Sequence, residues 1–198
     1  NMDRDLFNYV YSGEQKENQL IFTGSLAGVG RTPFLRYQIQ YTFWNDGEMQ
    51  IELSGKIKES CFWLQRFGFE FKTIAENDTF KYYGRGPLEN YCDMHHMAPV
   101  GMYRSSAEKE YVNYVYPQEH GNHIKTKMLK MDSGLTFATE SEFEFAVSEY
   151  TSYHLTDAMH TDELKPNSFT NIRIDYKNSG LGSNSCGPRL LPQYELNE

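Results

Sequence analysis

The stretch Leu-Arg-Tyr-Gln-Ile-Gln-Tyr-Thr-Phe at residues 35–43 alternates apolar and polar side chains without a break. Successive side chains of a β-strand point to opposite faces, so this period of two predicts a strand with one buried and one wetter face. The sequence Asn-Asp-Gly at residues 45–47 then indicates a tight turn, and the alternation resumes at residues 49–53. The pattern predicts a β-hairpin, the basic unit of an antiparallel sheet.

The same alternation recurs in three later stretches, at residues 67–71, 143–147 and 172–176. Each places aromatic or branched side chains on one face and polar or small side chains on the other. This arrangement is typical of an antiparallel sheet with one buried and one wetter face. Helical signal is weak, because only residues 152–164 place apolar side chains where they could share the face of a short helix.

The predicted strands decide the fold class. Many strands separated by loops rich in Gly and Pro, with almost no helix, predict an all-β antiparallel sandwich or barrel. The 198 residues are enough for a domain with a core of its own. We therefore expect a single domain over residues 1–198, in which roughly residues 1–20 form a leading linker or an edge strand.

Composition and charge argue against several classes of function. The net charge of −8 disfavours nucleic-acid binding, which depends on Lys and Arg, and a role at a membrane surface. No apolar run reaches the length of about 18 residues that a transmembrane helix needs. Aromatic residues make up 15 % of the chain, and Tyr and Phe suit both strands and surfaces that contact sugars or partners. Cys61, Cys92 and Cys186 form no CxxC pair, so we expect free thiols in a reducing compartment.

Three loops concentrate polar and aromatic residues, and the first is Tyr-Tyr-Gly-Arg-Gly-Pro-Leu-Glu-Asn-Tyr-Cys-Asp at residues 82–93. Its glycines and its proline favour a shaped turn that could present several side chains together. Arg85 could pair with Glu89 or Asp93 through a bidentate bridge. The alternative is a loop that is held together by its own hydrogen bonds and ion pair. The candidate cleft-lining residues of this loop are Tyr83, Arg85, Glu89, Asn90, Tyr91 and Asp93.

The second loop spans residues 111–126 and places Glu119, His120 and His123 close together in sequence. A carboxylate beside imidazoles could act in acid–base chemistry or bind a metal ion. The two histidines would share a face only in a helix, and the Pro and Gly of this loop argue against one. We expect the polar lining of a cleft or plain loop packing, and no metal site. The candidate cleft-lining residues of this loop are Glu119, His120, Asn122 and His123.

The third loop lies within residues 174–196, where a predicted strand runs into a glycine-rich segment carrying Asn184, Ser185 and Cys186. A loop on a rigid β scaffold is a common place for function. Cys186 could act as a nucleophile only beside a base and with a lowered pKa, and the sequence shows neither. We therefore expect no catalytic cysteine.

These three loops carry a resemblance to a known family. Residues 84–93 resemble the Gly-x-Gly-Pro-x-Glu-Asn-Tyr-x-Asp signature of the β-galactosidase small-chain domain. Residues 114–121 resemble the family's Tyr-Val-x-Pro-Gln-Glu-x-Gly segment, and residues 180–188 resemble its glycine loop near the C-terminus. Their order and spacing agree across roughly residues 20–197. The chain is similar to the C-terminal domain of glycoside hydrolase family 2 β-galactosidases.

The resemblance implies a large antiparallel β-supersandwich related in topology to the galactose mutarotases. It also implies that the two catalytic carboxylates lie in a separate TIM barrel, and 198 residues cannot hold a barrel beside a sandwich. We therefore expect no catalytic residue in this chain, and Glu89 and Glu119 are not assigned as acid and nucleophile. The implied partners are the barrel region or a large subunit, together with a galactoside substrate, and neither nucleic acid nor a membrane.

In the family that this chain resembles, the C-terminal glycine loop reaches the mouth of the barrel, where a Trp can contact sugar. The matching position is Cys186, which lacks that large apolar platform. The resemblance therefore implies a substrate rim of Asn184, Ser185 and Cys186 without a stacking surface. It implies no cofactor in this domain, although the full enzyme can use divalent and monovalent cations. We expect a cytoplasmic bacterial protein, with the periplasm as an open alternative.

Two other functions are compatible with the sequence. A stand-alone mutarotase or aldose epimerase would need a histidine and a carboxylate in one cleft, with Glu119, His120 and His123 as candidates. A carbohydrate-binding module would fit the aromatic content, but only Trp44 and Trp63 are available as Trp stacking platforms. Turnover of α- to β-galactose would favour the first alternative, and weak sugar binding would favour the second.

Overall fold

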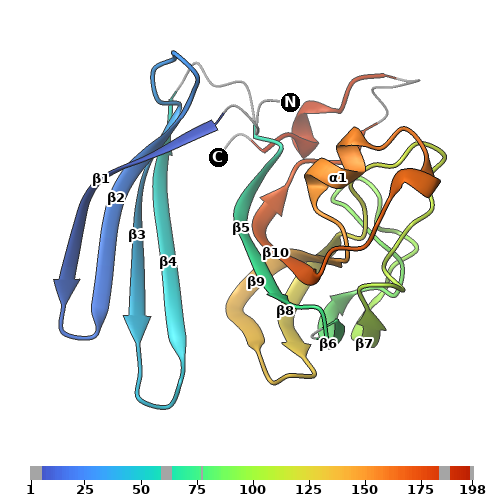
Figure 1. The fold of residues 1–198 in the computed structure, drawn as a ribbon, viewed down its shortest axis with the longest axis horizontal. Coiled ribbons are helices and arrows are strands. Elements are labelled where there is room, and N and C mark those ends of the chain that lie inside the picture. The colour runs from blue at the N-terminus through green and yellow to red at the C-terminus, as the bar shows by residue number, and fades with distance from the viewer. Residues whose placement is uncertain (1–5, 59–63, 77, 183–187, 197–198) are drawn as a thin grey trace. The chain divides into compact units, whose positions relative to one another are not determined.

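The computed structural model describes residues 6–58, 64–76, 78–182 and 188–196. The chain divides into two compact units, Asn1–Phe62 with Glu198, and Trp63–Asn197. Each unit has an antiparallel sheet of its own (Figure 1). The predicted all-β antiparallel fold class is therefore confirmed.

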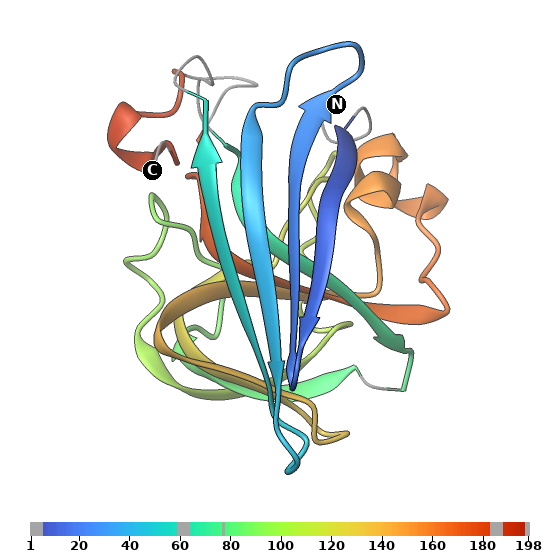
Figure 2. The ribbon, with the colours of Figure 1, turned by 90° about the vertical axis from the view of Figure 1, so that its left-hand side faces the viewer.

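The first unit is a meander of four strands, in the order β1 (Leu6–Lys16), β2 (Gln19–Gly28), β3 (Leu35–Phe43) and β4 (Met49–Ile57). Figure 2 shows these four strands side by side. Strands β3 and β4 pair in continuous register from one end to the other, which confirms the predicted hairpin. Gly47 lies in the connecting turn with a φ of 88°, a conformation that glycine adopts without a steric penalty.

The second unit contains β5 (Arg66–Ile74), β6 (Thr79–Arg85), β7 (Val100–Ser106), β8 (His123–Met131), β9 (Thr136–Ser148) and β10 (Phe169–Asn178). They form one sheet in the order β5-β10-β9-β8-β6-β7. The weak helical signal at residues 152–164 corresponds to the short helix α1 (Ser152–Asp157) and the 3₁₀ turn η2 (Thr161–Glu163). A second 3₁₀ turn, η3 (Pro192–Tyr194), lies near the C-terminus. In Figure 1, α1 and the long connections lie to one side of this sheet.

The hydrophobic core of the second unit lies on one face of its sheet. Its fully buried side chains come from four different strands, β6, β8, β9 and β10. They include Phe80, Tyr82, Leu129, Met131, Phe145, Val147 and Ile172. The Phe145 ring meets Phe80 edge-on, with a centroid distance of 5.8 Å, and also meets Tyr82, at 4.9 Å. Such edge-to-face contacts add to the stabilisation that burial of the rings supplies.

The opposite face of β9 and β10 is buried as well, and this differs from the wetter face that the alternation predicted. Glu144, Ala146, Arg173 and Asp175 are each less than 8 % exposed. Residues of α1 and of the second loop line a hollow together with Ala146 and Arg173, so these connections cover the face. The alternation gives the period of a strand but does not show that loops cover its polar side.

Three further predictions concern membrane-spanning helices, the leading segment and the domain architecture. No helix among the described residues is long and apolar enough to cross a membrane. Residues 6–16 of the leading segment form β1, which lies at an edge of its sheet. The single domain over residues 1–198 and the mutarotase-like supersandwich stay predictions.

Candidate functional site

Hydrogen bonds join the three polar loops to one another beside the six-stranded sheet. Antiparallel pairing brings the end of β6 beside the start of β8, while the end of β10 lies beside the start of β5. The first loop follows β6, the second leads into β8, and the third follows β10. Pairing therefore brings the first and second loops together, whereas hydrogen bonds to Asp93 join the third loop to the first.

Asn90 joins the first loop to the start of β8. Its side chain is fully buried, and its Nδ2 donates to the carbonyl oxygens of Arg85 (3.2 Å) and Leu88 (2.9 Å). Its Oδ1 accepts from the backbone N–H of Ile124 at 2.9 Å. The Asn90 backbone exchanges hydrogen bonds with Asn122, whose side chain is also fully buried. The two asparagines thus connect the loops from the interior, where neither side chain is exposed.

Glu89 makes a second connection between the same loops. Its carboxylate accepts hydrogen bonds from the Tyr114 hydroxyl and from the backbone N–H of Gly121, the latter at 2.9 Å. Gly121 has a φ of 73°, which favours glycine at this turn. Burial and the hydrogen bond to Glu89 raise the pKa of the Tyr114 hydroxyl. Glu89 therefore acts as an acceptor that closes the second loop onto the first.

His123 lies in the core of this junction, with no exposed surface. Its Nε2 is 2.7 Å from Oε2 of Glu110, and its Nδ1 is 3.0 Å from the Arg85 carbonyl oxygen. Its ring stacks on Phe145 with a centroid distance of 5.0 Å. A bulge in β8, with Lys125 at a φ of 56°, lies just after it. Both ring nitrogens have partners within the chain, so His123 is a structural residue of the interior.

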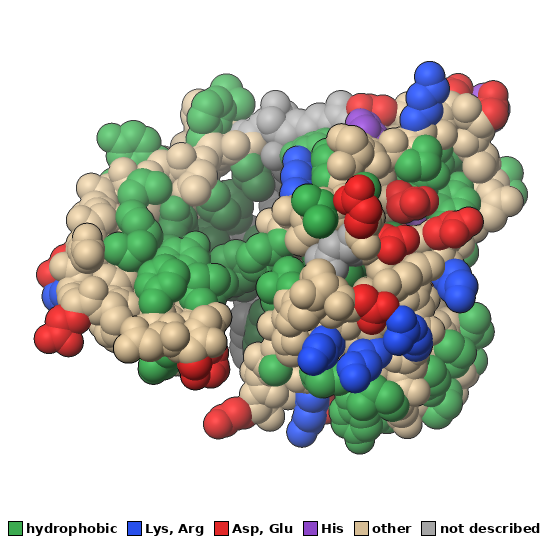
Figure 3. Space-filling view, turned by 60° about the horizontal axis from the view of Figure 1, so that its bottom comes forward, with side chains coloured by type: hydrophobic (Ala, Val, Ile, Leu, Met, Phe, Trp, Pro, Cys, Tyr) green, Lys and Arg blue, Asp and Glu red, His purple; other side chains and the backbone are tan. Residues whose placement is uncertain are grey.

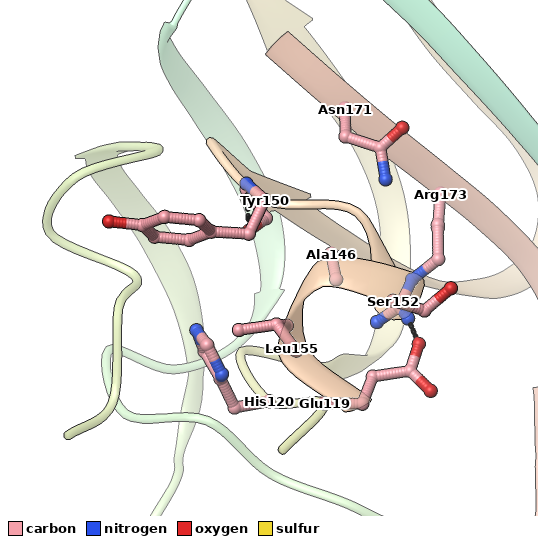
Figure 4. A pocket seen from close by; sticks show the side chains of 9 residues that line it. Glu119, His120, Ala146, Tyr150, Ser152, Leu155, Asn171 and Arg173 are labelled. Atoms are coloured by element: carbon pink, nitrogen blue, oxygen red, sulfur yellow. Dashed lines mark hydrogen bonds and ion pairs between the residues drawn. The ribbon is translucent and has the colours of Figure 1, made fainter. Parts of the chain in front are cut away.

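Glu119 and His120 line a small hollow between α1 and the polar face of β9 and β10. Figure 4 shows Glu119 paired with Arg173 on one side of this hollow, and His120 and Tyr150 on the other. Glu119 also pairs with Arg66. The complete lining is Glu119, His120, Ala146, Ser148, Tyr150, Ser152, Leu155, Asn171 and Arg173. His123 is not part of this lining, so only Glu119 and His120 of the three candidates for mutarotase chemistry share it, and Glu119 is paired with Arg173.

Asp93 connects the first loop to the third. Its Oδ1 accepts from the backbone N–H of Leu181 at 2.8 Å, and its Oδ2 accepts from that of Gly182 at 2.9 Å. The suggested pairing of Arg85 with Glu89 or Asp93 is wrong. Arg85 instead donates to the backbone carbonyl oxygens of His95 (3.3 Å) and Ala98 (2.7 Å), which lie further along the connection from β6 to β7. Nη1 of Arg85 makes both bonds, while its Nε is buried without a hydrogen-bond partner among the described residues.

The remaining predicted site residues have different environments. Tyr83 is 42 % exposed on β6, whereas Tyr91 is only 6 % exposed, and burial raises the pKa of the Tyr91 hydroxyl well above its usual range. The three candidates for the substrate rim lie outside the residues that the structure describes. They are Asn184, Ser185 and Cys186. Among the residues that the structure describes, no group of three or more His, Cys, Asp or Glu side chains is placed to hold a metal ion.

The sequence analysis missed a buried carboxyl pair below this junction. Glu144 of β9 and Asp175 of β10 are register partners, and they are 7 % and 3 % exposed. Nδ2 of Asn122 donates to Oε2 of Glu144 at 2.8 Å, which connects the pair to the loop junction. Burial raises the pKa of Glu144 to about 7 and that of Asp175 to about 6. Their alternating positions suggested the wetter face, so the sequence carried no signal of burial.

Comparisons with known proteins agree with the three loops. The family model described as beta galactosidase small chain matches residues 4–198. A β-galactosidase of Actinobacillus pleuropneumoniae is 35 % identical over 192 residues, which cover 96 % of this chain and 19 % of that protein. β-Galactosidases of Staphylococcus xylosus and Kluyveromyces lactis are 27 % and 34 % identical, over 98 % and 74 % of this chain. These segments are 20 % and 14 % of the two proteins.

The chain therefore belongs to the β-galactosidase small-chain family. It spans about a fifth of the length of the first two relatives and less of the third. The comparisons do not support the two alternatives, a stand-alone mutarotase and a carbohydrate-binding module.

Proposed function

We propose that this chain is a non-catalytic part of a larger β-galactosidase, which hydrolyses terminal β-D-galactosides. In that enzyme it completes the rim of the active site and stabilises the assembly. The observation that carries the proposal concerns Glu89 and Glu119, the glutamates of the family motifs. Both carboxylates are already bonded to other groups of this chain. Glu89 accepts from Tyr114 and Gly121, and Glu119 pairs with two arginines. A retaining glycosidase needs two carboxyl groups that are free to act on one sugar.

The proposed partner is the catalytic barrel region, either in the same polypeptide or in a large subunit. Exposed apolar side chains support a docking role, because such surfaces on soluble proteins often mark interfaces. Leu181 and Leu191, near the third loop, are 37 % and 57 % exposed. Figure 3 shows further apolar side chains exposed among charged ones on each unit. We propose that part of this surface is covered in the complete enzyme.

The environment of a thiol supports a cytoplasmic location in a bacterium. Cys92 is a free cysteine, and burial raises the pKa of its thiol to about 11, which keeps it protonated and unreactive at neutral pH. A free thiol suits a reducing compartment. We further propose that the domain needs no cofactor of its own, and that any divalent or monovalent cations act in the rest of the enzyme.

Hydrolysis of a chromogenic β-galactoside tests the proposed function. We expect no turnover by this chain alone, no turnover by the barrel-containing remainder alone, and activity when the two are combined by mixing or by fusion. The combination is needed because the acid and the nucleophile lie outside this chain while the rim lies within it. Turnover by the chain alone, or full activity of the remainder alone, would contradict the proposal.

A further inference from the structure

Strand β1 is the first strand of the four-stranded sheet and forms one of its edges (Figure 2). Among the described residues it pairs with β2 alone, so the backbone N–H and C=O groups along its outer side have no strand partner there. From Leu6 to Val10 the pairing with β2 is one to one, and the register shifts only between Val10 and Ser12. The first half of β1 is therefore a regular edge that a further strand can extend.

The first half of β1 also exposes large apolar side chains on both faces of the sheet. Alternation places Leu6 and Val10 on one face, where they are 38 % and 50 % exposed. Phe7 and Tyr9 lie on the other face and are 59 % and 65 % exposed. Residues 6–11 read Leu-Phe-Asn-Tyr-Val-Tyr and contain no Pro, Gly or charged residue. A run of this composition at an exposed edge invites association with another strand.

The other edge strands in the described part of the chain carry charges along their length. Charged side chains are a common protection of an exposed edge, because a further strand would have to bury them. Strands β4, β5 and β7 have such side chains, which are Glu52 and Lys56, Arg66, Glu70 and Lys72, and Arg104. The charges of β1 lie only at its far end, where Lys16 pairs with Glu14 at 3.1 Å. The uncharged half of β1 is therefore the edge that calls for a cover.

We propose that a β-strand from the part of the enzyme outside this chain pairs with residues 6–11 of β1 and extends the four-stranded sheet. A strand fits this edge because its own N–H and C=O groups can bond to those of β1, whereas the backbone groups of a helix are already bonded within the helix. Its side chains are apolar on both faces, to match those that β1 exposes on each. The inference rests on the proposed function. The chain spans only about a fifth of two related β-galactosidases, so the rest of such an enzyme can supply the strand.

A second copy of β1 matches this edge less well. Antiparallel pairing along the whole strand would set Lys16 opposite Leu6 and Glu14 opposite Asn8, so charges would face the uncharged half. Parallel pairing in register would set Glu14 beside Glu14 and Lys16 beside Lys16, and like charges directly opposite each other destabilise a sheet. A different strand with apolar side chains avoids both conflicts.

Amide hydrogen exchange followed by mass spectrometry tests the proposal on the full-length enzyme and on this chain alone. In the chain alone, the outward amides of residues 6–11 should exchange within seconds, because no strand protects them. In the full-length enzyme they should exchange at least about a hundredfold more slowly, because they are bonded to the added strand. Peptides from β3, an inner strand of the same sheet, are the internal control and should be protected equally in both.

Tyr9→Lys places a charge in the apolar half of the edge. Tyr9 is exposed, so the variant chain alone should melt within about 2 °C of the wild type. In the full-length enzyme the lysine would lie against the apolar side chains of the added strand, and the protection of residues 6–11 should fall at least about tenfold. Gln50→Lys is the matched control, because Gln50 is exposed on β4 at the opposite edge of the sheet. It should leave the exchange of β1 unchanged.

Fast exchange of residues 6–11 in the full-length enzyme would overturn the inference, and so would protection that Tyr9→Lys leaves unchanged. Slow exchange in the chain alone would overturn it as well. Protection that rises with chain concentration would then assign the cover to a second copy, and protection independent of concentration would assign it to the chain itself. Exchange does not depend on turnover, so the two proposals can fail separately. If deletion of this domain abolishes activity while β1 exchanges fast, only the added strand fails. If β1 is protected while the deletion leaves activity unchanged, only the proposed function fails.

Discussion

Asn90→Asp is expected to lower the free energy of unfolding of the chain by about 4 kcal/mol near pH 8. The buried Nδ2 of Asn90 donates to two backbone carbonyl oxygens, those of Arg85 and Leu88. An ionised aspartate has no donor, so it would place a negative charge against both oxygens in the interior. The substitution changes almost no volume, so the loss would report on hydrogen bonding and charge and not on packing.

Urea denaturation followed by circular dichroism measures this effect. Asn90→Ala should cost less, about 2–3 kcal/mol, because it leaves the Ile124 N–H and the two carbonyl oxygens unpaired but adds no charge. The penalty for the aspartate should shrink near pH 5, where the buried carboxyl takes up a proton. Asn45→Asp, in the exposed turn between β3 and β4, is the control and should stay within about 0.5 kcal/mol of the wild type. An aspartate variant as stable as the alanine variant near pH 8 would contradict this account.

Glu144→Gln is expected to stabilise the chain by about 2–3 kcal/mol near pH 8 and to change little near pH 4. Burial raises the pKa of Glu144 from 4.5 to about 7 in the folded chain, so the folded state binds a proton more tightly than the unfolded state. Stability is therefore lost as the pH rises from about 4.5 to about 7, and the full loss remains above that range. Gln imitates the protonated carboxyl and keeps an acceptor for Asn122, so it removes the pH-dependent loss.

Asp175 should behave in the same way over a lower range, since burial raises its pKa from 3.8 to about 6. Thermal unfolding of the wild type and of Glu144→Gln across this pH range gives the difference directly. Glu142→Gln is the matched control, because Glu142 is an exposed residue of the same strand. The control should follow the wild type at every pH. Parallel curves for the wild type and Glu144→Gln would show that Glu144 titrates normally.

Local sequence patterns predicted individual strands and turns better than they predicted how the strands pair into sheets. The β3–β4 hairpin follows from alternation and an Asn-Asp-Gly turn, because all of its determinants lie within about twenty residues of sequence. The order of the six-stranded sheet depends on pairing between distant segments, such as β5 with β10, and no local pattern encodes it. The burial of Glu144 depends on the second loop, whose Asn122 reaches the polar face of β9, and alternation cannot reveal this.

The candidate site was predicted in part. The three loops were identified from their composition, and the described parts of all three are joined by hydrogen bonds. The roles within them were less predictable, because Arg85 has carbonyl acceptors in place of the expected carboxylates. The buried amides of Asn90 and Asn122 and the buried ring of His123 connect loops and do not line an open cleft. A polar residue type indicates that a partner is needed, but it does not distinguish a ligand from the chain's own backbone.

The contacts of Asp93 also bear on the order in which the second unit folds. They join residues that are 88 and 89 positions apart, so the intervening chain must be largely arranged before these bonds can form. Because the entropy of closing so long a loop is lost before the contact is gained, such bonds are expected to form after the folding transition state. Their loss would then hasten unfolding and leave the folding rate almost unchanged. The contacts of Asp93 with Leu181 and Gly182 would be among the last in this unit to form and the first to break.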